Sequence, residues 1–412
     1  MEAGTHLEAA LAAPRTVESR VADEAWREGR ASRGSGRIRV AFCIDNMGVG
    51  GTELNALRTA ERLDRARFEV VVVCLQSDGP LLARYHERGI RVLRLPIGHL
   101  YGIRALRQAR RLRRFFLEER IDIVHCHDVY DNIFSVACAR SARVPVVIAS
   151  RRWWDEVPRR VLRLLNQHAY RLADRVIANS LTVAQLLIAR EGVLAERVSV
   201  VPNFVGEEAF APVSDGARRA RLAAFDVPPH ALVAGCVAGV RPVKDHASLI
   251  RALAVLHPGW PSLHLVLVGD GEARPALQAL VAQLELGDVV HFAGGQPNVP
   301  NPHALFDVSV LCSLSEAFPN SIVEAMAAGT AVVATRVGGV GDAVADGVTG
   351  LLVPPRAPEP LAAAIEALLR DPVWRERMGR AGRQRAYDEF HESRVIPRLE
   401  ALYECLLEAR VR

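Results

Sequence analysis

Residues Ser313–Gly350 read SLSEAFPNSIVEAMAAGTAVVATRVGGVGDAVADGVTG, and this stretch decides the fold class. The apolar runs Val308–Leu311 before it and Ala331–Thr335 inside it are typical of strands, and Ser321–Ala328 between them has a helical pattern. Two short strands joined by a helix form a parallel crossover unit. We therefore expect a parallel sheet with helices on its faces.

The same alternation fills two series, separated by the Gly-, Pro-, Ala- and Arg-rich interval Gly206–Pro229. The expected strands are Ile38–Ile44, Glu69–Cys74, Arg91–Leu95, Ile121–Cys126, Val146–Ser150, Val176–Ala178, Ser199–Val201, Ala231–Val237, Leu263–Val268, Val289–Phe292, Val308–Leu311, Ala331–Thr335 and Leu351–Val353. Expected helices include Glu53–Leu63, Arg104–Glu119, Ala247–Leu256, Ala273–Leu284, Ser321–Ala328, Pro360–Leu369, Val373–Glu389 and Ser393–Leu407. This pattern predicts two doubly wound α/β domains, with ligands bound in the cleft between them.

The expected organisation is an extension at 1–36, a Rossmann-like domain at 37–208, a linker at 209–229, a second Rossmann-like domain at 230–388 and a C-terminal helix at 389–412. We expect the extension to be disordered or loosely helical, because it lacks the apolar centre of a secretory signal. No window of ~18 uninterrupted apolar residues predicts a transmembrane helix. Seven scattered cysteines without a CxxC pair favour neither disulfides nor zinc and indicate a reducing cytoplasm.

The chain has 51 arginines and one lysine, Lys244. It lies in a turn after the apolar run Ala231–Val237 and before a helical segment that begins at His246, with Arg241 three residues earlier. A compact ammonium at such a place can hold a phosphate against a helix N-terminus. Chance survival of a surface lysine is the alternative.

Glu316 and Glu324 are two carboxylates eight residues apart. Pro319 prevents one continuous helix, so we expect Glu316 in a loop and Glu324 in the first turn of the next helix. Carboxylates beside free amide donors suit the hydroxyls of a sugar and a ribose. Helix-capping acids are the alternative, and nothing in the spacing places the two carboxyls on opposite sides of a scissile bond, as a glycosidase requires.

Residues Asn46–Glu53, NMGVGGTE, follow the first strand and open a helix. Gly50 and Gly51 allow a ligand phosphate to approach the backbone, although a tight strand–helix turn is the alternative. His125 and His127 share one face of a strand, and we expect His127 to reach the cleft. Without an evident third ligand we expect no metal, and a structural histidine is the alternative.

Residues Arg104–Phe116 predict a basic helix, with Ile103, Leu106 and Phe116 as its apolar side. A second basic and aromatic stretch runs from Arg151 through Arg163. Both lie in residues 37–210, where 28 arginines face 19 acidic residues for a net charge of +9, against −3 for residues 211–412. This pattern fits an anionic membrane surface. A solvated crossover helix is the alternative, and without a recognisable nucleic-acid module we expect no nucleic-acid partner.

Together these residues resemble the retaining, nucleotide-sugar-dependent glycosyltransferases of family four, also called glycosyl transferases group 1, which have a GT-B fold. The resemblance covers about residues 37–405. Its main part is Ser313–Gly350, which looks like the family's E-x7-E block and the Gly-Gly segment after it. Val268–Gly271, Val290–Gly294 and Val200–Asn203 match as well.

The resemblance implies catalytic roles for Lys244, which would neutralise the donor pyrophosphate, for Glu316, which would contact the donor sugar, and for His127 beside the transferred sugar. The other implied donor contacts are Gly50, Gly51, Arg241, Phe318, Pro319, Asn320, Ser321 and, through the ribose hydroxyls, Glu324. No cofactor or metal is implied beyond the nucleotide-sugar itself. The acceptor-binding domain would be the first and the nucleotide-sugar-binding domain the second, with the C-terminal helices crossing back to the first.

Three positions depart from the family pattern. The family usually has an arginine five residues before the lysine, where this chain has Gly239. We expect Arg241 to take over the second phosphate contact. Ala317 replaces a glycine after the first glutamate. Pro202–Gly206 replaces a P-N-G-x-D segment, so no aspartate is available there.

We expect a cytoplasmic enzyme, peripheral on the inner face of the cell membrane, that transfers a sugar with retention to a hydroxyl of a lipid-linked or surface polysaccharide intermediate. Two alternatives remain from the sequence. One is another GT-B enzyme, such as a sugar-nucleotide epimerase or a phosphorylase. The other is a non-catalytic sugar-nucleotide-binding scaffold, for which Gly239 is the main support.

Overall fold

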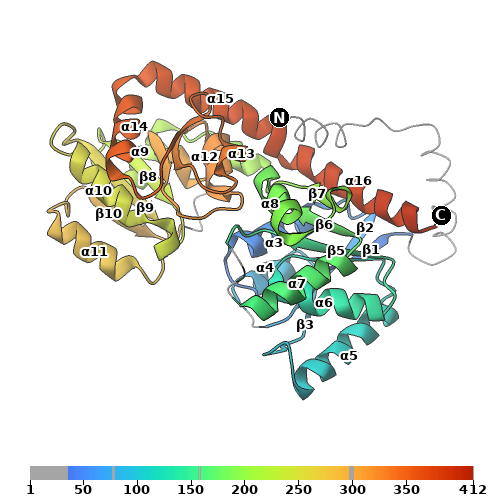
Figure 1. Cartoon of the computed structure of the whole chain (residues 1–412). Coiled ribbons are helices and arrows are strands. Elements are labelled where there is room, and N and C mark those ends of the chain that lie inside the picture. Colours follow the sequence, from blue (N-terminus) through green and yellow to red (C-terminus); the bar gives the residue numbers. More distant parts are fainter. Residues whose placement is uncertain (1–35, 77–78, 156, 158, 297–300, 412) are drawn as a thin grey trace.

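The computed structural model describes residues 36–76, 79–155, 157, 159–296 and 301–411. Within them the chain forms two parallel sheets flanked by helices, and Figure 1 shows these as two domains connected by the C-terminal helices. The expected two-domain α/β fold is confirmed. The extension predicted at residues 1–36 lies outside the described residues, apart from Gly36.

In the described residues the first sheet has the order β3-β2-β1-β4-β5-β6-β7. Its strands are β1 (Ile38–Ile44), β2 (Phe68–Cys74), β3 (Arg91–Arg94), β4 (Ile123–Cys126), β5 (Val146–Arg151), β6 (Arg175–Ala178) and β7 (Val198–Val200). Its helices are α3 (Gly51–Arg62), α4 (Leu81–Glu87), α5 (Ile103–Glu118), α6 (Val129–Ser141), α7 (Arg160–Leu172) and α8 (Leu181–Glu191), with short turns η1 (Ala195–Arg197) and η2 (Glu207–Phe210).

The second sheet has the order β10-β9-β8-β11-β12-β13 in the same described ranges. Its strands are β8 (Leu232–Val237), β9 (Leu263–Val268), β10 (Val290–Gly294), β11 (Val308–Leu311), β12 (Ala331–Thr335) and β13 (Gly350–Val353). The surrounding elements are α9 (Asp215–Ala223), η3 (Pro242–Lys244), α10 (His246–Leu256), α11 (Arg274–Gln283), η4 (Pro302–Leu305), α12 (Asn320–Ala328), α13 (Val340–Ala343) and α14 (Pro358–Arg370).

Strand β1 shows why the apolar runs are nearly continuous. Ala41 and Cys43 point into one hydrophobic core of the first domain, and Val40, Phe42 and Ile44 point into the core on the other face. All five are at most 1% exposed. A parallel strand buried on both faces needs apolar residues at nearly every position, and β1 shows this pattern except at the partly buried Arg39.

The last two helices connect the domains. Helix α15 (Pro372–Phe390) packs against α12 of the second domain, and α16 (Glu392–Val411) lies along the first domain (Figure 1). The hydroxyl of Tyr403 lies 2.6 Å from Nδ1 of His125 in β4. Glu400 accepts a hydrogen bond of 2.8 Å from the backbone N–H of Asp64. The expected return of the C-terminal helices to the first domain is therefore confirmed.

Each sheet reverses its strand order at one place, between β1 and β4 in the first domain and between β8 and β11 in the second. All recorded strand pairs in both sheets are parallel. At such a reversal the flanking helices lie on opposite faces of the sheet, which opens a crevice at the carboxyl ends of the strands. The loops after these four strands are where a ligand site is expected.

Candidate functional site

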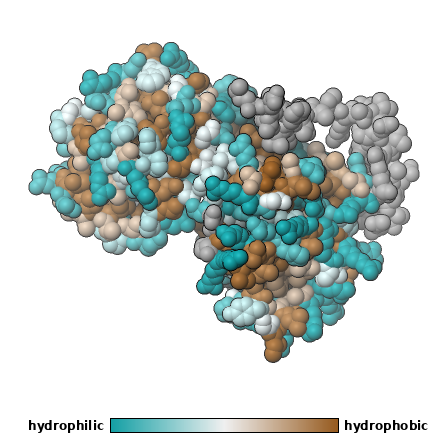
Figure 2. Space-filling model, viewed as in Figure 1, coloured by the Kyte–Doolittle hydropathy of each residue, from teal (hydrophilic) through white to brown (hydrophobic). Residues whose placement is uncertain are grey.

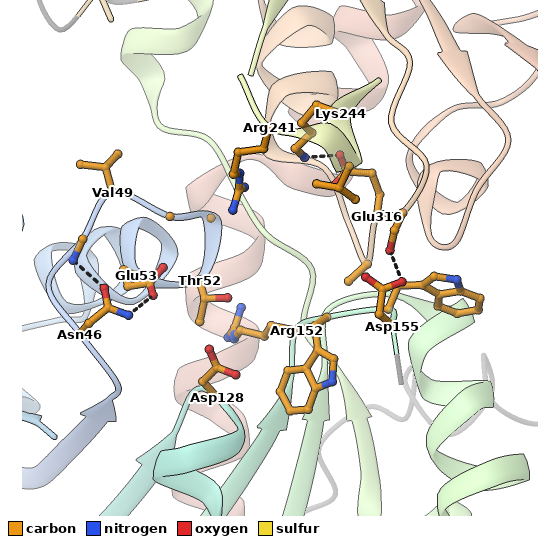
Figure 3. Close-up of a pocket in the computed structure, with 18 residues that line it drawn as sticks. Asn46, Val49, Thr52, Glu53, Asp128, Arg152, Asp155, Arg241, Lys244 and Glu316 are labelled. Atoms are coloured by element: carbon orange, nitrogen blue, oxygen red, sulfur yellow. Dashed lines mark hydrogen bonds and ion pairs between the residues drawn. The ribbon is translucent and has the colours of Figure 1, made fainter. Parts of the chain in front are cut away.

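A pocket of about 480 Å³ opens between the two domains at these strand ends (Figure 3). The first domain lines it with Asn46, Gly48, Val49, Gly50, Gly51, Thr52, Glu53, Asp128, Arg152, Trp153, Trp154 and Asp155. The second domain contributes Arg241, Val243, Lys244, Ser315, Glu316 and Ala317. These residues follow β1, β4, β5, β8 and β11. The volume is in the range of small-molecule sites.

Lys244 and Glu316 form an ion pair on the wall made by the second domain, with their side chains 16% and 11% exposed. Ser313 donates a hydrogen bond of 2.6 Å to the same oxygen, Oε1 of Glu316. Lys244 is the last residue of η3, and Asp245 after it has a φ of +46°, which turns the chain into α10. The ammonium and the carboxylate are therefore held at the pocket by local structure on both sides.

Arg241 points into the pocket from the second domain (Figure 3). Within the described part of the chain no carboxylate forms an ion pair with it. A Cβ placed on Gly239 would lie 3.5 Å from Nε of Arg241, an ordinary contact distance. The Arg241 guanidinium therefore lies beside the space that a side chain at position 239 would enter.

The loop after β1 and the start of α3 form the opposite wall. Asn46 accepts a hydrogen bond of 2.8 Å from the N–H of Gly48 and donates one of 3.1 Å to Glu53. A Cβ on Gly50, the residue before α3, would lie 2.2 Å from the Glu53 carboxylate, so a larger side chain does not fit there without movement. The N–H groups of the first helical turn have no partners within the helix and favour an anion.

Asp128 follows β4 and caps α6, where its carboxylate accepts a hydrogen bond of 2.7 Å from the N–H of Val129. Burial raises the pKa of Asp128 to about 7. Asp131 accepts hydrogen bonds from the backbone N–H groups of His127 and Asp128, at 2.8 and 2.6 Å. The pocket thus contains one carboxyl group that is partly protonated near neutral pH.

The structure contradicts the expectation that His127 reaches the cleft. Its ring is fully buried, is absent from the pocket wall and stacks on His125 with the ring centroids 4.3 Å apart. The two rings lie on the same side, as alternation predicted, although β4 ends at Cys126 and His127 follows it. Burial lowers the pKa of His127 well below its ordinary value, so the ring is neutral. The next residue, Asp128, lines the pocket instead.

The residues from Phe318 to Glu324 also lie outside the pocket wall. The Phe318 carbonyl accepts a hydrogen bond of 3.1 Å from Asn203, Pro319 precedes α12, and Glu324 pairs with Arg58 of the first domain. Asn320 donates to the Gly51 carbonyl at 3.5 Å, and Ser321 lies 3.2 Å from a ring nitrogen of His303. The structure therefore brings together Gly50, Gly51, Arg241, Lys244 and Glu316 but not His127, Phe318, Pro319, Asn320, Ser321 or Glu324.

The segment Arg152–Asp155 lines the pocket, although the sequence suggested a membrane surface for this stretch. Arg151 and Arg152 are buried, and Arg151 forms an ion pair with Glu191 in which the side chains are 1% and 7% exposed. The surface interpretation of Arg151 and Arg152 is wrong because both side chains are buried inside the domain. Their position directly after a predicted strand is the signal that indicates a cleft residue.

Two sequence comparisons identify the family. The family described as Glycosyltransferase Family 4 matches residues 49–208, and Glycosyl transferases group 1 matches residues 223–385. A D-inositol 3-phosphate glycosyltransferase from Nocardiopsis dassonvillei is 34% identical over 65% of this chain and 67% of its own length. The chain belongs to the family 4 glycosyltransferases of group 1.

A second D-inositol 3-phosphate glycosyltransferase, from Streptosporangium roseum, is 36% identical over 60% of this chain. The match spans 59% of that relative's length, so the chain covers about three fifths of the length of this relative.

Solved structures confirm the GT-B fold. Anabaena HepE in complex with UDP matches with a TM-score of 0.79 at 22% identity, over 90% of this chain and 99% of HepE. Sucrose-phosphate synthase from Thermosynechococcus elongatus matches with a TM-score of 0.77 at 23% identity, over 90% and 100%. At this level of identity the likeness establishes the fold alone.

Proposed function

We propose that this chain transfers a sugar from a nucleoside diphosphate sugar to a hydroxyl group of an acceptor, with retention at the anomeric carbon. The observation that carries the proposal is the pocket in which Lys244 and Arg241 of the second domain face Gly50 and Gly51 at the start of α3 in the first. Two cations and a helix N-terminus on opposite sides of one pocket suit a diphosphate. Membership of a glycosyltransferase family, and a fold neighbour solved with UDP-glucose, support this choice.

In the proposed reaction the bond between the anomeric carbon and the diphosphate oxygen breaks, and the electron pair leaves with the nucleoside diphosphate. Lys244 and Arg241 stabilise the charge that develops on this leaving group. The acceptor hydroxyl attacks on the same face, and its proton passes to the departing phosphate. Glu316, held by Lys244 and Ser313, accepts hydrogen bonds from sugar hydroxyls. No step requires a metal or a further cofactor, and metal independence is part of the proposal.

The proposed acceptor is a lipid-linked or surface polysaccharide intermediate, and the proposed location is the cytoplasmic face of a membrane. Helix α5 supports this proposal, since Ile103 and Leu106 are 78% and 53% exposed beside the exposed Arg107, Arg110 and Arg111. Figure 2 shows an apolar tip at the foot of the first domain, where Figure 1 places α5.

Other features limit that surface. Phe116, expected on the same side as Ile103 and Leu106, is 2% exposed and packs in the core. None of the helices in the described ranges is long and apolar enough to span a bilayer.

The first experiment is a screen of the purified full chain against UDP-, GDP- and ADP-sugars, with melting temperature and released nucleotide as readouts. We expect one donor to raise the melting temperature and to be hydrolysed slowly without an acceptor. If no donor binds, the proposed function fails and the scaffold alternative is favoured. A donor converted to another sugar nucleotide without acceptor would identify an epimerase, and a strict need for inorganic phosphate would identify a phosphorylase.

Lys244→Ala is the matching variant. Removal of a cation that stabilises the leaving group costs on the order of 10²- to 10³-fold in turnover, while the melting temperature without donor stays close to that of the parent. Full turnover by the folded variant would contradict the role assigned to Lys244. The exposed Arg251 on α10 provides a matched control, because Arg251→Ala removes a positive charge of the same domain outside the pocket wall.

A further inference from the structure

Arg152 is a buried guanidinium in the pocket wall. It follows β5, is 8% exposed and still lines the pocket. Its Nη1 donates hydrogen bonds to the side-chain oxygens of Asn55 and Asn203, at 2.8 and 3.2 Å. Its Nε has no hydrogen-bond partner. Both partners are neutral amides, so the guanidinium is oriented but its charge is not neutralised.

The neighbouring Arg151 shows the contrast. It is buried more deeply than Arg152, but it forms an ion pair with Glu191. No carboxylate of the described residues forms an ion pair with Arg152. A buried charge without a counter-ion costs several kcal/mol. Burial lowers the pKa of Arg152 to about 10, which leaves the side chain charged at neutral pH. The fold therefore maintains an unneutralised positive charge at a pocket, which is unfavourable unless an anion binds there.

The carboxyl groups of the pocket are engaged elsewhere. Glu316 pairs with Lys244, Glu53 accepts from Asn46, and Asp155 accepts a hydrogen bond of 2.8 Å from Ser315. Asp128 accepts from the N–H of Val129, and burial raises its pKa to about 7. None of them is arranged to serve as the counter-ion of Arg152.

Arg152 lies on the pocket wall opposite the two cations of the second domain. Lys244 and Arg241 enter the pocket from the second domain, whereas Arg152 extends from a strand end of the first domain toward Thr52 (Figure 3). In the proposed reaction the diphosphate lies between the second-domain cations and Gly50 and Gly51, so the acceptor enters along the rest of the first-domain wall, which includes Arg152. Beside Arg152, Trp153 also lines the pocket, and its ring N–H is buried without a partner. Two buried donor groups without partners, Nε of Arg152 and the ring N–H of Trp153, thus belong to residues of the first-domain pocket wall.

We propose that Arg152 binds an oxyanion carried by the acceptor, so that the acceptor of this chain is an anionic hydroxyl compound, a phosphate ester or a carboxylate. A guanidinium can bind either group with two parallel hydrogen bonds. The hydrogen bonds to Asn55 and Asn203 hold the guanidinium group in place for that contact. The proposal rests on the proposed transfer reaction, because it names the substrate class of the same pocket.

The test uses the full chain saturated with the nucleoside diphosphate that binds best, starting with UDP. Inorganic phosphate and, separately, acetate are titrated against tryptophan fluorescence, because Trp153 and Trp154 line the pocket. We expect a saturable change in fluorescence with at least one of the two anions. A change with phosphate indicates a phosphate ester, and a change with acetate indicates a carboxylate. Arg152→Met and Arg152→Gln should weaken this binding at least tenfold while nucleotide affinity changes less than twofold. Arg241→Gln, on the opposite wall, should retain the anion site.

The variants also separate binding from a structural role. Met has a similar volume without the charge, and replacing a buried charge by an apolar residue is often neutral or stabilising. We therefore expect Arg152→Met to melt within a few degrees of the parent. Failure of both variants to fold, or anion binding that survives both substitutions, would overturn the proposal. If no nucleotide binds, the proposed transfer fails instead, and the same titration without nucleotide still tests the Arg152 site.

Discussion

Arg58 and Glu324 form an ion pair across the two domains, with Nη2 of the arginine 2.9 Å from Oε1 of the glutamate. Arg58 lies on α3 and Glu324 on α12, and their side chains are 19% and 21% exposed. Glu324 is the residue for which the family resemblance implies a contact with the donor ribose. In this structure the Glu324 carboxylate is therefore paired with Arg58 instead of accepting hydrogen bonds from a ribose.

Replacing Arg58 by Ala should tighten nucleotide binding. The arginine and the ribose hydroxyls compete for one carboxylate, and a partly exposed ion pair is worth up to about 1 kcal/mol. Its loss should lower the nucleotide Kd by up to about fivefold, measured by titration calorimetry. Arg65→Ala provides the control, because Arg65 is an exposed residue after α3 that hydrogen-bonds within its own domain. Weaker binding by Arg58→Ala would instead make Arg58 a ligand of the donor.

Gly338 should be intolerant of any side chain. Its φ is +45°, and a Cβ there would lie 1.9 Å from the Glu316 carbonyl oxygen and 3.1 Å from Trp154. Gly338→Ala must displace the loop that holds Glu316, so we expect kcat/KM to fall at least tenfold and stability to fall by about 1–3 kcal/mol. Gly341→Ala serves as the comparison, because nothing lies within 4 Å of its Cβ position. Equal activity of the two variants would show that the loop tolerates displacement.

The strands were the most predictable part of the fold. The bounds expected for β1, β9, β11 and β12 equal those of the structure. Apart from the partly buried Arg39 in β1, every residue of these strands is buried. Two-sided burial produces a continuous apolar run that ends where the chain leaves the sheet. Lys244 and Glu316 could be located for a related reason, since each lies in the connection after such a run, which begins at the carboxyl end of a strand.

Contacts between residues distant in sequence were not predictable. Arg58 and Glu324 are 266 positions apart, and no local pattern indicates that they meet. The expectation that His127 reaches the cleft was wrong for a different reason. Alternation gives the face of a strand on which a residue lies but not its depth below the cleft. Arg152 was misplaced because an arginine next to tryptophans looks the same on a surface and in a pocket. Only the burial of Arg152 and its contacts to Asn55 and Asn203 distinguish the two.

Asp128 should make stability depend on pH. Burial raises its folded-state pKa to about 7 from an ordinary value of 3.8, so the folded chain binds a proton that the unfolded chain releases. The stability that this bound proton contributes is fully present below about pH 4 and is lost as pH rises through about 7. Asp128→Asn cannot ionise and keeps a good capping residue. The variant should exceed the parent in stability at pH 8 by up to about 4 kcal/mol, and the difference should shrink toward pH 4.

Chemical denaturation of the parent and Asp128→Asn across this pH range measures the effect. Asp45, whose pKa burial also raises, is present in both proteins. The pKa of Asp131 is raised by burial and by the charge of Asp128, so part of the measured difference comes from Asp131. Glu118→Gln, at the exposed end of α5, is a matched removal of one carboxylate outside the site. A stability difference that stays constant with pH would mean that the substitution acts only through the helix cap.

The exposed arginines of α5 should govern membrane binding. Arg107, Arg110 and Arg111 are exposed, close to the exposed Ile103 and Leu106. Each basic residue near an anionic surface contributes about 1 kcal/mol. Changing the three arginines to Gln should therefore reduce sedimentation with phosphatidylglycerol vesicles by about 100-fold in partition coefficient, with little binding of either protein to phosphatidylcholine alone.

The matched control removes the same charge from the second domain and α15. Arg219, Arg251 and Arg377 are exposed as well, so their replacement by Gln gives an equal change in net charge. If the proposed orientation holds, this control binds vesicles like the parent, since these residues lie outside the first domain. Equal loss in both triple variants would indicate attraction by net charge alone, and unchanged binding without the α5 arginines would remove α5 from the membrane contact.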